Sequence, residues 1–100
     1  MFRSRPQPYE ERYYNSSDGL KLYYRDYEGP SGRTPVLCIP GLTRNSRDFD
    51  FIAAHMARSR RIIVADLRGR GKSEHAKDPR HYVVAIEAAD MVRLLEDAGI

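Results

Sequence analysis

Two loops in this chain carry residues that could take part in chemistry. The first follows an apolar run, Val36 to Ile39, and reads Pro40-Gly41-Leu42-Thr43. Gly41 lets the backbone bend sharply at the end of a strand, which leaves amide groups pointing into the crevice where open α/β sheets bind ligands. Because unpaired N–H donors in a dry crevice suit an anion, this turn is a candidate anion-binding site.

The second loop follows another apolar run, residues 62–65, and reads Asp-Leu-Arg-Gly-Arg-Gly-Lys-Ser over residues 66–73. Its two glycines permit a tight reversal, while Asp66 and Ser73 can form hydrogen bonds with loop amides. Arg68 can pair with a carboxylate. These side chains are predicted to brace the loop, and Arg68, nearest the crevice, is the best candidate for a further role.

Nucleotide-binding motifs fit this loop poorly. A Walker A loop needs a glycine five residues before Gly71, and that position holds Asp66, whose charge would repel phosphate. The dinucleotide pattern needs a third glycine where Glu74 stands. Both motifs are therefore disfavoured.

Nucleophile and metal signatures are also weak. No serine in the chain lies in a G-x-S-x-G nucleophile elbow. The two remaining candidate sets are a metal-binding set of His75, Asp78 and His81 and a serine-protease-like set of His55, Asp66 and Ser73. Neither is favoured, because the first lacks a ligand-spacing signature and the second has no oxyanion donors legible beside its serine.

The elements that must position these loops are legible from hydropathy. Residues 12–27 read as a hairpin around Ser17-Asp18-Gly19, and the alternation of its second arm predicts one face in contact with water. The runs at 36–39 and 62–65 lack alternation, as parallel strands covered on both faces do. The architecture predicted is an antiparallel hairpin followed by parallel strands with flanking helices.

Two amphipathic helices are predicted. Asn45 and Ser46 can cap the first, and its apolar positions are Phe49, Ile52, Ala53 and Met56. The second ends at Gly99, and its apolar positions are Val84, Ala88, Met91 and Leu95.

Composition sets the broad class. Hydrophobic residues make up 41% and charged residues 31% of the 100 residues, which is ordinary for a globular domain. With no membrane-length apolar stretch and no apolar leader segment, we expect a cytoplasmic protein that does not bind membranes. The single cysteine, Cys38, is predicted to be a core residue. The net charge of +3 comes with no interleaved aromatic platform, so nucleic-acid binding is disfavoured.

The order of the two loops, and the motif at 66–73 above all, resembles the amino-terminal part of an α/β-hydrolase. The resemblance covers residues 12–100, and residues 1–11 are predicted to be a disordered or extended lead-in. It implies that the N–H of Leu42, after the turn at Gly41, is an oxyanion-hole donor, and that Thr43 and Arg68 belong to the active-site loops. The family usually has histidine where this chain has Pro40, which alters how the turn is braced but leaves the Leu42 donor in place.

The resemblance also implies a reaction. It predicts hydrolysis of a small-molecule ester, or of a carbon–carbon bond or epoxide, through a nucleophile–acid–histidine triad that lies C-terminal to Ile100. Neither a metal nor an organic cofactor is expected. The 100 residues alone are predicted to be inactive.

Two further expectations concern partners. In the family's strand order the strand at 36–39 would expose an apolar edge here, and such an edge predicts self-association. The alternative function is a small non-enzymatic binding module that contacts an acidic partner through its arginine-rich loops.

Overall fold

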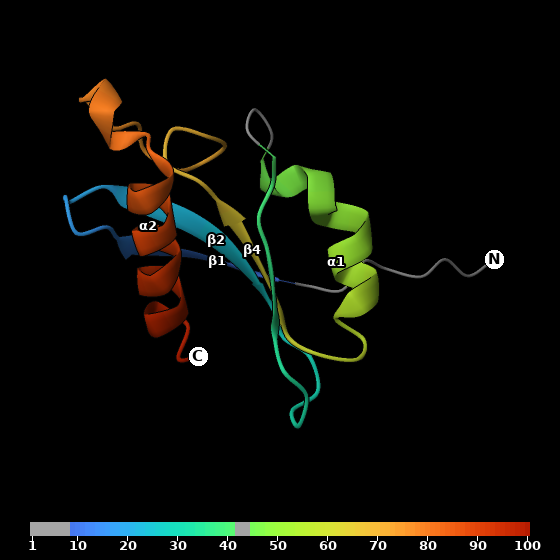
Figure 1. Cartoon of the computed structure of the whole chain (residues 1–100). Coiled ribbons are helices and arrows are strands. Elements are labelled where there is room, and N and C mark those ends of the chain that lie inside the picture. The colour runs from blue at the N-terminus through green and yellow to red at the C-terminus, as the bar shows by residue number, and fades with distance from the viewer. Residues whose placement is uncertain (1–8, 42–44) are drawn as a thin grey trace.

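The computed structural model describes residues 9–41 and 45–100, and these residues form a four-stranded sheet with a helix on each side (Figure 1). The elements in chain order are β1 (Glu10–Asn15), β2 (Lys21–Tyr27), β3 (Val36–Cys38), the 3-10 helix η1 (Ser46–Phe49), α1 (Asp50–Met56), β4 (Ile62–Asp66), the 3-10 helix η2 (Pro79–His81) and α2 (Val84–Asp97). The strand order is β1-β2-β4-β3. β1 and β2 form an antiparallel hairpin, β2 is antiparallel to β4, and β3 is parallel to β4, which confirms the predicted α/β class.

The predicted hairpin is present, with its turn at the expected residues. Gly19 has a φ of +89°, which its lack of a side chain permits. Ser16 fixes the turn, since its Oγ accepts a hydrogen bond from the Leu20 N–H at 2.9 Å. β1 begins at Glu10, two residues before the predicted boundary of the domain at Arg12.

The prediction that β2 has one face in contact with water is wrong. Every residue of the strand after Lys21 is buried. Leu22 and Tyr24 pack against α2, while on the opposite face Arg25 forms an ion pair with Asp50, the first residue of α1. Polar and aromatic side chains on this second face are covered by neighbouring elements rather than by solvent.

The core has two halves, one on each side of the sheet. Alternate residues of β4 point to opposite sides, so Ile63 and Ala65 pack toward α2 while Ile62 and Val64 pack toward α1. Cys38 lies in the α1 half, and burial raises the pKa of its thiol. The predicted core role of the cysteine is confirmed.

The first predicted helix begins as expected, but its buried face is narrower than predicted. The Asn45 side chain caps it by accepting a hydrogen bond from the Arg47 N–H at 2.9 Å. The first turn is the 3-10 helix η1, and α1 follows. Ala53 is fully buried, whereas Ile52, predicted to be on the same apolar face, is 53% exposed.

The second predicted helix has the correct position and a different buried face. Met91 and Leu94 pack on the sheet, but Val84 is 82% exposed and Ala88 is also exposed. Asp90, a charged residue, is buried beside Met91. The predicted apolar stripe is therefore right for Met91 and wrong for Val84 and Ala88.

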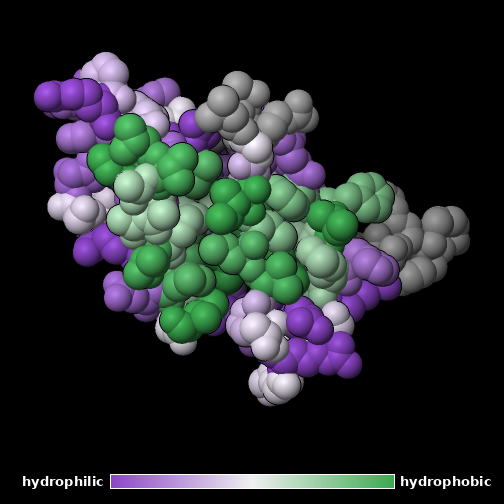
Figure 2. Space-filling model, viewed as in Figure 1, coloured by the Kyte–Doolittle hydropathy of each residue, from purple (hydrophilic) through white to green (hydrophobic). Residues whose placement is uncertain are grey.

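One face of the molecule remains largely hydrophobic. β3 pairs with β4 on one side only within the described residues, and Ile39, just after β3, is 47% exposed. Figure 2 shows hydrophobic residues gathered across this face, over the region where α2, β3 and α1 lie in Figure 1. In the part of the chain that the structure describes, no helix has the length and apolar character needed to cross a membrane.

Candidate functional site

The two loops singled out from the sequence leave the sheet at the same end. β3 and β4 are parallel, with Val36 beside Ile62 and Cys38 beside Val64, so their carboxyl ends lie together. Pro40 is buried after β3, and Gly41 is exposed. Leu42 and Thr43 lie outside the described residues, so their predicted roles rest on the sequence.

Asp66, the last residue of β4, ties these two loops together. The residue is 1% exposed. Oδ1 accepts a hydrogen bond from the Ser46 N–H at 2.6 Å, at the start of η1, and Oδ2 accepts one from the Lys72 N–H at 2.9 Å. The prediction that Asp66 would bind loop amides is confirmed by the Lys72 contact, and its second contact is to the first residue of η1, which follows the other loop.

Ser73 joins the same loop to the sheet. Its Oγ donates to the Asp66 carbonyl oxygen at 2.6 Å and accepts from the Tyr23 N–H at 2.8 Å. Both contacts are buried, and they bridge Tyr23 and Asp66, which form a register pair of β2 and β4 at the end of β4. Ser73 therefore braces the loop, as predicted.

Arg68 forms an ion-pair cluster with Asp90 and Asp18. Its side chain has no exposure, and its five N–H donors are all engaged. Nε and Nη2 donate to the Asp90 carboxylate at 2.7 and 2.9 Å, and both terminal nitrogens donate to Asp18 at 2.9 and 3.0 Å. The fifth contact is to the His81 carbonyl oxygen at 3.4 Å. No donor is left for a substrate, so the geometry supports a bracing role for this side chain.

This cluster shifts the ionisation of its members. Hydrogen bonds from Arg68 hold the pKa of the Asp18 carboxyl well below its usual range. Hydrogen bonds to Asp90 and then Asp18 raise the pKa of Arg68. The cluster links three parts of the chain, namely the β1–β2 turn, the loop after β4 and helix α2.

Sequence reasoning missed Asp90 as the partner of Arg68. On α2 it stands directly before Met91, inside the face that packs on the sheet. A carboxylate within an apolar helical face is unusual unless it is paired. The position of Asp90 within this apolar face was therefore the signal available in the sequence.

The metal-binding and serine-protease-like sets do not form sites. His75, Asp78 and His81 line one open pocket beside the hairpin turn, but among the described residues no group of three His, Cys, Asp or Glu side chains is arranged to hold a metal ion. His55 is exposed on α1, whereas Asp66 and Ser73 are buried and hold main-chain groups by hydrogen bonds.

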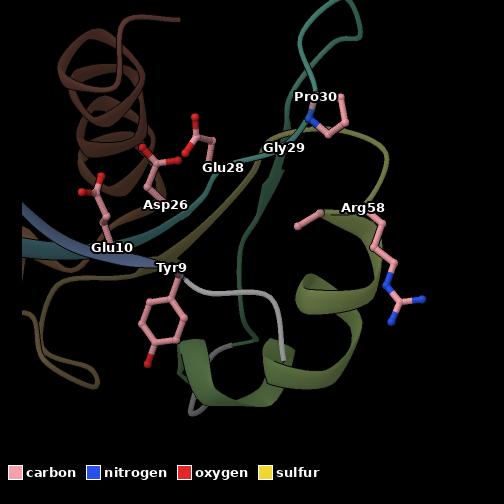
Figure 3. A pocket seen from close by; sticks show the side chains of 8 residues that line it. Tyr9, Glu10, Asp26, Glu28, Gly29, Pro30 and Arg58 are labelled. Carbon is pink, nitrogen blue, oxygen red and sulfur yellow. The ribbon is translucent and has the colours of Figure 1, made fainter. Parts of the chain in front are cut away.

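A second open pocket lies at the other end of the sheet, between the start of β1, the end of β2 and the end of α1 (Figure 3). Its walls include Tyr9, Glu10 and Arg58. Asp26 also lines it, and its carboxylate accepts two hydrogen bonds from Arg61, at 3.0 and 2.8 Å. This pocket is remote from the carboxyl ends of β3 and β4, so it is not the candidate active site.

Comparison with known proteins identifies the fold seen in this sheet. A sequence profile of the alpha/beta hydrolase fold family matches residues 34–100, which span β3, β4, α2 and both loops. The chain belongs to the alpha/beta hydrolase fold family. The family membership inferred from the two loop motifs is thereby confirmed.

Individual proteins similar to this chain agree with this assignment. The chain is 47% identical to an alpha/beta hydrolase from Novosphingobium aromaticivorans, with a TM-score of 0.89 over 97% of this chain and 34% of that one. It is 36% identical over 75 residues to the 3-hydroxybutyrate-oligomer hydrolase of Cupriavidus necator, covering 26% of that protein. It is 34% identical over 68 residues to a serine hydrolase-like protein of Danio rerio, covering 21% of it. The chain thus spans about a third or less of the length of these relatives.

Proposed function

We propose that this chain is the amino-terminal part of an ester hydrolase, in which the turn after β3 supplies an oxyanion-hole donor. The Leu42 N–H is the proposed donor, with Gly41 permitting the bend. The nucleophile, acid and histidine are proposed to lie C-terminal to Ile100, which fits the share of each relative that the chain covers. The substrate is a small molecule, and no cofactor takes part.

The observation that carries this proposal is the joining of the two loops at the carboxyl ends of the parallel strands. Ligands of open α/β sheets bind at this edge. The Asp66 carboxylate links the segment after β3 to the loop after β4 through the Ser46 and Lys72 amides. We propose that this link preorganises the turn, because preorganised N–H donors are worth most where negative charge develops in the transition state.

The binding-module alternative is less well supported. It needs arginine-rich loops that are available to an acidic partner. Instead, Arg68 is buried between two aspartates, Arg70 donates to Glu87 at 3.1 Å and Lys72 pairs with Glu11. Cations already paired within the chain contribute little to binding an external polyanion.

The test is esterase activity of the product of the complete open reading frame that carries these residues, called here the complete protein. We expect it to hydrolyse p-nitrophenyl acetate or butyrate, and the 100-residue chain to show no turnover above background. Short oligomers of 3-hydroxybutyrate are a second substrate to assay, because the Cupriavidus necator relative carries them in its name. An epoxide and a carbon–carbon bond substrate serve as competing classes. A complete protein that turns over none of these, or esterase activity in the 100 residues that a point change abolishes, would contradict the proposal.

A further inference from the structure

No further inference is drawn: the strongest candidate, the apolar surface patch over α2, β3 and α1 in Figure 2, carries nothing because no contact in the part of the chain that the structure describes shows what covers it.

Discussion

Arg68 and Asp90 form the most deeply buried ion pair among the described residues, with exposed side-chain fractions of 0% and 2%. Removing one member of such a pair leaves the other charge buried without its compensation. The pair therefore contributes more to holding α2 against the loop after β4 than an ion pair at the surface would.

Substituting Asp90 should show this in stability. Asp90→Asn leaves one acceptor oxygen for the two Arg68 donors that now bind the carboxylate, and we expect the free energy of unfolding to fall by about 3 kcal/mol. The measurement is urea unfolding of the complete protein. Glu87→Gln is the matched control, because Glu87 lies on the same helix and pairs with Arg70 of the same loop while both side chains keep contact with solvent. Its cost should stay near or below about 1 kcal/mol, and equal losses in the two variants would contradict the prediction.

Asp18 gives the same cluster a dependence on pH. Its pKa is lowered in the folded state, so the stability that it contributes is fully present above its unfolded pKa and is lost as the pH falls through the folded pKa. At neutral pH, Asp18→Asn should melt at a lower temperature than wild type. Below about pH 4, the ordinary value for an aspartate, the two melting temperatures should begin to converge. Melting curves recorded from pH 7 to pH 2 test this, and a constant difference over that range would contradict it.

At the scale of the elements, helix α2 is held to the sheet by few side chains. Leu94 is fully buried among Leu22, Tyr24 and Ile63, whereas Val92, two residues before it, is 56% exposed. Leu94→Ala should lower the free energy of unfolding by about 3 kcal/mol because it leaves a cavity. Val92→Ala removes apolar atoms from the same helix at an exposed position and should change stability by less than about 0.5 kcal/mol. The free energy of unfolding of both variants is measured by chemical denaturation. Similar losses in Leu94→Ala and Val92→Ala would show that α2 does not pack as described.

The elements differ in how well the sequence predicts them. The strands at 36–38 and 62–66 are legible because buried parallel strands form continuous apolar runs, and the hairpin is legible because Asp-Gly favours its turn. The buried face of β2 could not be read, since Arg25 looks like a solvent-facing residue until its pairing with Asp50 is known. The buried face of α2 could not be read for the same reason, since Asp90 looks like a solvent-facing residue until its pairing with Arg68 is known. Hydropathy patterns record side-chain type, whereas these two positions are decided by long-range ion pairs.

The candidate site shows the same division. The motif at 66–73 predicts a braced loop, and Asp66 and Ser73 do brace it. The contact from Asp66 to Ser46 could not be predicted from spacing, because it joins residues 20 positions apart that only the parallel pairing of β3 and β4 brings together. Contacts within one turn can be predicted from neighbouring residues, whereas contacts between loops depend on the register of the sheet.

At the scale of the molecule, the 100-residue chain exposes apolar surface that the sheet and helices do not cover. β3 has a partner on one side only within the described residues, and Ile39, just after it, is an exposed large apolar side chain. Each helix also exposes one, Phe51 on α1 and Val84 on α2. Unpaired strand edges recruit other chains, and contiguous apolar patches mark interaction surfaces. Figure 2 shows how continuous this surface is.

The isolated chain should therefore associate through the β3 edge. We expect sedimentation velocity to show oligomers or aggregates whose fraction rises with concentration. Ile39→Lys places a charge beside the free edge and should reduce association, because lysine opposes edge-to-edge pairing. Tyr13→Lys is the matched control: Tyr13 is 42% exposed, against 47% for Ile39, but it lies on β1 at the opposite edge of the sheet, so association should persist. A monodisperse wild-type monomer that melts cooperatively would contradict the prediction, and equal relief of association by the two lysine variants would place the contact elsewhere than at β3.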